Sequence, residues 1–151
     1  MTRVAIALGS NLGDREATLR AALAALAPFL TDLRISSFHE TDPVGVDPQP
    51  RFLNSAATAQ TNLPATAVLT TLLDVERQFG RERPHPGAAR TLDLDLILYG
   101  GAVLNEPGLI VPHPRFRERL FVLEPLAEIA PGLIDPLTGL TVAALLTRLR
   151  T

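Results

Sequence analysis

One stretch, Arg90 to Gly100, constrains the fold of this chain most, because leucines alternate in it with two aspartates (Arg-Thr-Leu-Asp-Leu-Asp-Leu-Ile-Leu-Tyr-Gly). An apolar residue at every second position predicts a β-strand, since successive side chains on a strand point to opposite faces. One face then carries Leu92, Leu94, Leu96 and Leu98, and the other carries Asp93, Asp95, Ile97 and Tyr99. We therefore expect helices to cover the leucine face and two carboxylates to point away from those helices.

The aspartate pair suggests a site for a hard cation. Carboxylates at positions i and i+2 of a strand lie roughly 7 Å apart, close enough to hold one cation or a pair of cations. The alternative is structural, because strands also carry Asp on solvated faces. The neighbouring Ile97 and Tyr99 favour a half-buried face, where paired carboxylates need a metal or an arginine. Candidate arginines stand just upstream, at Arg81, Arg83 and Arg90.

Composition excludes several classes of function. A chain of 151 residues with 46% hydrophobic content suits one domain, over residues 1–151, with a real core. The formal net charge of −2 argues against a general binder of nucleic acid or anionic membranes, so we expect small-molecule partners. Cysteine is absent, which excludes thiolate chemistry, and lysine is absent, which excludes a P-loop lysine or a Schiff base. No apolar run approaches bilayer length, and we expect a soluble cytoplasmic protein.

The predicted elements follow the order strand, helix, strand, strand, helix, strand. Their ranges are 4–8, a helix ending near 27, 33–40, 52–61, a helix over 64–79, and the aspartate strand. This βαββαβ order predicts an α+β fold with a ferredoxin-like antiparallel sheet and both helices on one face. Two further helices, over 120–129 and 142–149, form a C-terminal helical extension. We expect the other face of the sheet to be free for a ligand.

Other segments supply candidate binding groups. Phe52 and Asn54 share one face of a predicted strand, and an aromatic ring beside an amide suits a flat heterocycle. Glu76 borders the apolar stripe of its helix, a pattern equally consistent with a partner and with plain exposure. Residues 80–89 are rich in Gly, Pro and Arg, as in a mobile lid or an inert loop. Residues 112–119 contain a His and three Arg, which suit phosphate.

The turn at 9–14, Gly-Ser-Asn-Leu-Gly-Asp, lies between the first strand and the first helix. Its glycines are not spaced as a dinucleotide fingerprint. We therefore interpret it as turn geometry with a helix cap, in preference to an anion site.

Several motifs together resemble one enzyme family. They are the turn at 9–14, Ser-Ser-Phe at 36–38 with Thr41, Pro43 and Gly45, Phe-Leu-Asn at 52–54, Gly-Arg-Glu-Arg at 80–83, Arg-Thr-Leu-Asp-Leu-Asp at 90–95 and Val-Pro-His at 111–113. With these motifs the chain resembles the 6-hydroxymethyl-7,8-dihydropterin pyrophosphokinases of folate biosynthesis. The resemblance implies transfer of the terminal diphosphate of ATP to the pterin hydroxymethyl oxygen, leaving AMP. It also implies a ferredoxin-like fold, ATP as co-substrate and a pair of Mg²⁺ ions.

The resemblance implies roles for individual residues. Asp93 and Asp95 match the metal ligands of the family. The pterin pocket is matched by Thr41, Asp42, Val44, Phe52, Asn54 and Phe121. Nucleotide and phosphate contacts are matched by Glu76, Arg81, Arg83, Arg90, His113 and Arg119, and the candidate catalytic residues among them are Arg81, Arg83 and Arg90.

The chain also departs from the family pattern. Members often carry an aromatic residue just before the Arg-Thr-Leu-Asp motif, whereas this chain has Pro-Gly-Ala-Ala at 86–89 and no Trp. Leu73 and Gly108 stand where some members have polar groups that meet the nucleotide. We therefore expect fewer side chains to hold ATP here.

Two other classes of function stay open at this point. A ferredoxin-like RNA-binding module would stack bases on the same sheet face, although its aromatic strand motif is absent. A regulatory sensor would use the pocket without catalysis. We expect an enzyme that acts as a monomer on two small molecules, without a nucleic-acid or membrane partner.

Overall fold

The computed structural model describes residues 1–41, 51–79 and 92–151 of the chain. Its strands are β1 (Thr2–Ser10), β2 (Thr31–Ile35), β3 (His39–Thr41), β4 (Phe52–Thr61), β5 (Asp93–Tyr99), β6 (Leu104–Glu106) and β7 (Leu109–Val111). Its helices are α1 (Arg15–Leu26), α2 (Ala65–Gln78), α3 (Leu120–Ile129), α4 (Val142–Arg150) and the 3₁₀ turn η1 (Phe116–Glu118). No helix among these described residues is long and apolar enough to span a membrane.

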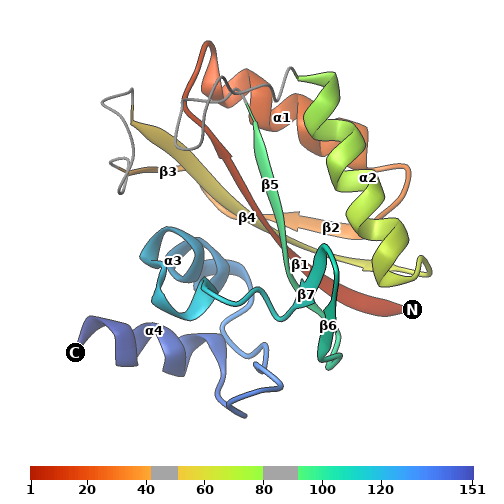
Figure 1. Ribbon diagram of the computed structural model, residues 1–151. Helices are drawn as coiled ribbons and strands as arrows, with labels where there is room; N and C mark the ends of the chain where they lie inside the picture. The colour runs from red at the N-terminus through yellow and green to blue at the C-terminus, as the bar shows by residue number, and fades with distance from the viewer. Residues whose placement is uncertain (42–50, 80–91) are drawn as a thin grey trace.

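The central sheet has the strand order β2-β4-β1-β5, and β3 continues the pairing of β2 along the same edge of β4. Every pair in it is antiparallel. Figure 1 shows α1 and α2 on one side of this sheet, and α3 and α4 on the other. The predicted α+β class with an antiparallel sheet is confirmed. Strand β7 pairs with β6 in a separate hairpin.

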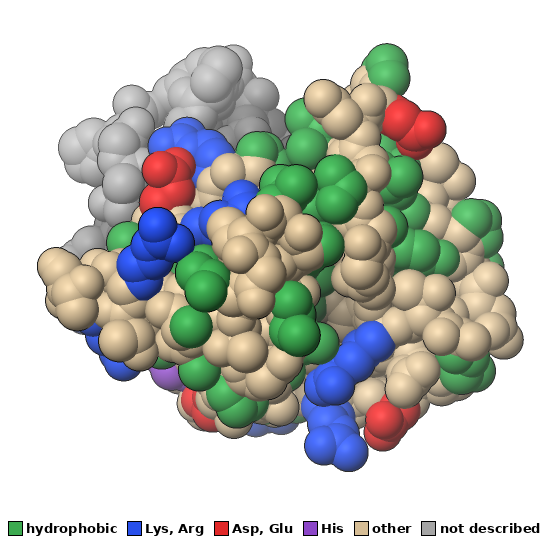
Figure 2. All heavy atoms as spheres, turned by 90° about the horizontal axis from the view of Figure 1, so that it is seen from below, with side chains coloured by type: hydrophobic (Ala, Val, Ile, Leu, Met, Phe, Trp, Pro, Cys, Tyr) green, Lys and Arg blue, Asp and Glu red, His purple; other side chains and the backbone are tan. Residues whose placement is uncertain are grey.

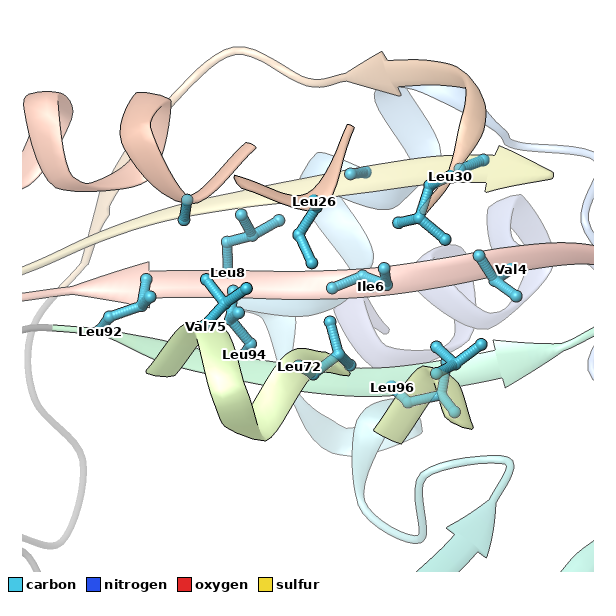
Figure 3. Packing of buried hydrophobic residues seen from close by; sticks show 14 of the residues in the cluster. Val4, Ile6, Leu8, Leu26, Leu30, Leu72, Val75, Leu92, Leu94 and Leu96 are labelled. Atoms are coloured by element: carbon cyan, nitrogen blue, oxygen red, sulfur yellow. The ribbon is translucent and has the colours of Figure 1, made fainter. Parts of the chain in front are cut away.

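The first face of the sheet packs against α1 and α2. Val4, Ile6 and Leu8 alternate along β1 and point into this core, where Leu26 and Leu72 meet them (Figure 3). Helix α1 begins where the sequence predicts, because the Asp14 carboxylate accepts the backbone N–H of Ala17 at 3.1 Å and caps the helix. The apolar stripes of both helices face the sheet, as their spacing predicts.

The second face of the sheet carries small residues on β1, and α3 and α4 pack over them. Ala5 and Ala7 are buried there with Ile97, against Val122 and Leu126 of α3. The prediction that this face is free for a ligand is therefore wrong over the part that α3 and α4 cover. Small side chains on the strand leave room for a helix layer to approach the sheet closely. Seen from this side, the surface mixes hydrophobic side chains with arginines that lie beside acidic groups (Figure 2).

The predicted single strand over 33–40 is wrong, because the chain leaves the sheet between β2 and β3. Ser36 is buried at the break, and its hydroxyl accepts the backbone N–H of Ala56 at 2.9 Å. A side chain thus takes the place that a strand carbonyl would occupy in a regular ladder. The Ser36 hydroxyl also lies 3.0 Å from that of Ser55.

Strand β5 contains a bulge, which corrects the predicted alternation beyond Leu96. Ile6 pairs with Leu96 and Ala5 pairs with Leu98, so Ile97 is an extra residue on β5. Two residues facing one partner shift the side-chain alternation by one position. Leu98 therefore joins the core under α3 and α4, and Tyr99 packs against the core under α1 and α2. The Tyr99 hydroxyl donates to the Leu63 carbonyl at 2.6 Å.

Candidate functional site

Three adjacent strands place Asn54, Gly9 and Asp93 in one row across the sheet. Gly9 on β1 pairs with Asn54 on β4 and with Asp93 on β5. All three lie on the face of the sheet that carries α3, because their neighbours Leu8, Leu53 and Leu94 belong to the opposite core. Two strand spacings separate the outer members of the row, which is about 10 Å. The amide and the carboxylate therefore stand on either side of a residue that has no side chain.

Gly9 is buried, and the side chains of Asn54 and Phe52 lie close over its Cα. A Cβ added at Gly9 would lie 2.9 Å from Asn54 Oδ1 and 3.7 Å from Phe52 Cδ1. The first distance is shorter than real Cβ contacts allow, so the Asn54 amide occupies its position only because residue 9 is glycine. The sequence motif around Gly9 indicated a turn, and it gave no sign of this close approach.

The Asn54 amide is held in one orientation. Its Nδ2 donates to the hydroxyl of Thr41 on β3, 2.5 Å away, and its Oδ1 lies over Gly9. Asn54 is buried, and Phe52 lies two residues earlier on the same face of β4 and is partly exposed. The predicted grouping of Thr41, Phe52 and Asn54 is therefore present in the structure.

Phe121 lies in the first turn of α3 and packs against the second core. The Arg119 guanidinium lies over its ring, with 5.6 Å between Cζ and the ring centroid. A cation in this position is attracted by the π face, which also fixes where the guanidinium stands. Phe121 therefore holds the Arg119 guanidinium in place at the start of α3.

Glu76 on α2 is buried, with 1% of its surface exposed, and has a partner. Its Oε2 accepts the backbone N–H of Leu94 at 2.7 Å. Strand β5 lies at the end of the sheet order, so this N–H points away from β1, toward the side of β5 on which none of the described strands pairs. The sequence left open whether Glu76 has a partner or is simply exposed, and the structure shows a buried side chain with a partner. The contact joins α2 to the strand that carries both aspartates.

A pocket of about 320 Å³ opens beside β5. Most of its lining is apolar, and its polar side chains are Glu76, Asp95 and His113. Leu73 and Gly108 also line it, at the two positions where polar groups were expected to be missing. The pocket has the size and the mostly apolar lining that are common for small-molecule sites.

His113 is fixed beside the aspartate strand. Its backbone N–H donates to the Ile97 carbonyl at 2.9 Å, and its Nδ1 accepts the backbone N–H of Arg115 at 3.2 Å. Burial lowers the pKa of His113, and the charges of Arg119 and Arg115 lower it further, while Asp93 acts in the opposite direction. The ring is therefore neutral at pH 7, with its proton on Nε2 as a hydrogen-bond donor.

The aspartates supply oxygen ligands, but too few to enclose a cation by themselves. Asp93 and Asp95 are both half-buried and stand on the same face of β5 before the bulge. Among the described residues, no group of three or more acidic or His side chains could hold a metal ion. Two carboxylates fit Mg²⁺, which usually keeps several waters and binds substrate phosphates in addition to one or two carboxylates.

The remaining candidates divide into two groups. Asp42, Val44, Arg81, Arg83 and Arg90 lie outside the described residues, as does the predicted lid at 80–89. Within the Arg-rich segment, Arg115 pairs with Glu118 at 3.1 Å, and Arg117 pairs with the buried Asp135. These two arginines are engaged within the protein, which leaves Arg119 as the phosphate candidate from that cluster.

Comparisons with known proteins agree with one another. Residues 5–131 match the family model described as 7,8-dihydro-6-hydroxymethylpterin-pyrophosphokinase (HPPK). A Bacillus subtilis protein named 2-amino-4-hydroxy-6-hydroxymethyldihydropteridine pyrophosphokinase is 48% identical over 126 residues, which cover 82% of this chain and 75% of the relative. A Methylorubrum extorquens protein of the same name is 40% identical over 151 residues, covering 99% of this chain and 94% of the relative.

Solved structures show the same fold. The crystal structure of HPPK-DHPS from Plasmodium falciparum superposes with a TM-score of 0.77 at 13% sequence identity. The match covers 97% of this chain and 44% of that one, so this chain corresponds to less than half of the larger protein.

Proposed function

The chain belongs to the 7,8-dihydro-6-hydroxymethylpterin-pyrophosphokinase family, and from that premise we propose that it transfers the diphosphate of ATP to the hydroxymethyl oxygen of 6-hydroxymethyl-7,8-dihydropterin, releasing AMP. The observation that carries the proposal is the row of Asn54, Gly9 and Asp93. It sets a heterocycle-reading amide about 10 Å from a carboxylate on the same face of the sheet. A substrate held by the amide would have its reactive end toward the aspartates.

The pterin would lie beside Asn54, on the face of the sheet that carries α3. The Oδ1 of Asn54 would accept from the pterin N–H groups, because Nδ2 is already engaged by Thr41. Phe52 and Phe121 would supply apolar surface for the flat ring system. Asp42 and Val44 complete the proposed pocket on the basis of the family motif.

The nucleotide would occupy the pocket beside β5. His113 would donate its Nε2–H to a phosphate oxygen, and Arg119, held over Phe121, would add a positive charge. Glu76 holds β5 against α2, and Arg81, Arg83 and Arg90 are proposed to contact the triphosphate and to act on the transferring group. Asp93 and Asp95 would hold Mg²⁺, and the bound metal would neutralise the triphosphate and polarise the β-phosphorus. Catalysis would then depend on positioning and charge more than on a general base.

We further propose that the four long strands with α1 and α2 form a ferredoxin-like unit, that residues 1–151 are one domain and that the enzyme acts as a monomer. The strand order β2-β4-β1-β5 and the helix positions support the first assignment. The RNA-binding alternative is disfavoured, because α3 and α4 cover part of the sheet face on which bases would stack.

The test is to incubate the purified protein with ATP, Mg²⁺ and 6-hydroxymethyl-7,8-dihydropterin and to identify the nucleotide product. We expect AMP in a one-to-one ratio with the pterin diphosphate, and no AMP when the pterin is left out. ADP as the main product would show attack at the γ-phosphorus and would overturn the proposal. Pterin binding without any turnover would favour the regulatory sensor.

A further inference from the structure

The break between β2 and β3 is closed by a residue from the opposite end of the chain. Glu128, near the C-terminal end of α3, accepts the backbone N–H of Ser37 at 2.6 Å and the Ser37 hydroxyl at 2.6 Å. Its Oε1 also lies 3.1 Å from His39 Nε2. One carboxylate therefore binds three groups on the segment that leads into β3.

This contact compensates for a defect in the sheet. At the break, the Ser36 hydroxyl takes the Ala56 N–H that a strand carbonyl would otherwise accept. The N–H of Ser37 is then left to Glu128. Strand β3 has three residues and, among the described strands, pairs with β4 alone, while Glu40 on it also pairs with Arg15 and Arg51. A short edge strand of this kind depends on contacts from outside the sheet.

Strand β3 also contacts residues of the proposed pterin pocket. His39 is the register partner of Asn54, and Thr41 is the partner of Phe52. Thr41 holds the Asn54 amide through its hydroxyl. A displacement of β3 would therefore move the group that orients Asn54.

Helix α3 carries Phe121, which belongs to the proposed pterin pocket. Phe121 lies in its first turn and Glu128 near its end, and the helix packs against β4. Glu128 thus connects the helix that carries Phe121 to the strand that carries Thr41.

We propose that Glu128 is a positioning residue for the pterin site, which fixes β3 relative to α3 so that Thr41 holds the Asn54 amide in its reading orientation. This inference rests on the proposed function of the site. Glu128 contacts neither Gly9 nor the pocket beside β5, so its effect on the substrate passes through Ser37, His39 and Thr41. Hydrogen bonds from Ser37 and then from His39 lower the pKa of Glu128, so the carboxylate is charged at pH 7.

The experiment compares Glu128→Ala with Glu124→Ala. Glu124 lies one turn earlier on α3 and is about as exposed, but it pairs with Arg150 at 2.9 Å, away from β3. Calorimetric titration would measure the affinity of each variant for 6-hydroxymethylpterin, in the presence of a non-hydrolysable ATP analogue, and separately for that analogue. We expect about a tenfold loss of pterin affinity in Glu128→Ala only, with affinity for the ATP analogue unchanged, because small misplacements of binding groups weaken a site strongly.

A double-mutant cycle with Asn54→Ala separates positioning from general destabilisation. If Glu128 acts through the Asn54 amide, Glu128→Ala should cause little further loss of pterin affinity once Asn54 is Ala, so the two effects are not additive. Glu128→Gln keeps one acceptor oxygen for Ser37 and should restore part of the affinity, and it also serves if Glu128→Ala fails to fold.

The possible outcomes are distinct. Equal pterin affinity in Glu128→Ala, Glu128→Gln and Glu124→Ala would overturn the positioning role while leaving the proposed function intact. Equal losses for pterin and for the ATP analogue would also overturn it, since they indicate a general structural effect. Failure of the unmodified protein to bind pterin would overturn the proposed function itself.

Discussion

At the scale of single residues, the glycine at position 9 makes the sharpest prediction. Gly9→Ala places a Cβ 2.9 Å from Asn54 Oδ1, so the amide must move. We expect pterin affinity to fall about tenfold, with little change in melting temperature, because a site built on a hydrogen bond loses affinity when its partner is misplaced. Gly101→Ala is the control, since nothing lies within 4 Å of a Cβ there. Unchanged pterin affinity in Gly9→Ala would show that the substrate does not depend on the position of the Asn54 amide.

The aspartates make a second prediction at this scale. Asp93→Ala or Asp95→Ala should each lower kcat by roughly a thousandfold, about 4 kcal/mol, because one ligand of the triphosphate-bound cation is lost. The melting temperature of the metal-free protein should stay level or rise, since two like charges on one half-buried face repel each other. Differential scanning fluorimetry with EDTA, beside steady-state rates, gives both readings. A large fall in melting temperature with activity retained would make the pair structural.

At the scale of elements, the pair between Arg117 and Asp135 ties the segment after β7 to the loop before α4. Asp135 has a fully buried side chain and accepts from Arg117 Nε at 2.5 Å and Nη2 at 2.9 Å, and also from Thr138 and the N–H of Leu137. Asp135→Asn leaves the guanidinium without its counter-charge. We expect a loss of about 3 kcal/mol in unfolding free energy, or roughly 6–12 °C in melting temperature. Glu118→Gln, which breaks the exposed pair with Arg115, should cost under about 1 kcal/mol.

The same pair predicts a pH dependence. Burial acts to raise the pKa of Asp135, but hydrogen bonds from Arg117, Thr138 and Leu137 outweigh burial and hold that pKa below its ordinary value of 3.8. A carboxyl with a lowered folded-state pKa stabilises the fold above 3.8, and this contribution is lost as the pH falls through the folded-state pKa. The difference in melting temperature between the unmodified protein and Asp135→Asn should therefore be largest at pH 7 and should decrease below pH 3.8. A gap that is constant with pH would contradict this account.

The elements that periodicity predicts from the sequence are those with local causes. The stripe of α2, the alternation of β4 and the cap at Asp14 depend on residues within a few positions of one another, and all are found. The break before β3 was missed, because its stabilising groups come from Ala56 and from Glu128, which is 91 positions from Ser37. The bulge at Ile97 was missed for the same reason, since a register shift is a property of two strands.

The candidate site could be predicted in part. The sequence pattern placed Asp93 and Asp95 on one face, and Phe52 beside Asn54, because both are matters of strand alternation. The role of Gly9 depends on the pairing of β1 with β4, and the partner of Glu76 depends on how α2 meets the edge of β5. Contacts between different elements cannot be predicted from the spacing of residues along the chain.

At the scale of the whole molecule, the sheet has a core on each face, and we predict that the two are equally necessary. Leu72 lies in the core under α1 and α2, and Leu123 lies in the core under α3 and α4. Leu72→Ala and Leu123→Ala should each cost about 2–5 kcal/mol and should both leave a single unfolding transition in urea. A second transition that appears only in Leu123→Ala would make the C-terminal helices a separate appendage.

Because the Tyr99 hydroxyl is bonded to the Leu63 carbonyl, the tyrosine ring is an intrinsic spectroscopic probe of the contact between β5 and the start of α2. The chain has one tyrosine and no tryptophan. Apart from the weak emission of its phenylalanines, its ultraviolet fluorescence therefore comes from the Tyr99 ring. That ring stands at the end of β5, and its hydroxyl is bonded to the carbonyl just before α2. Tyrosine fluorescence and near-ultraviolet circular dichroism will therefore follow the docking of α2 onto the aspartate strand directly, without a label.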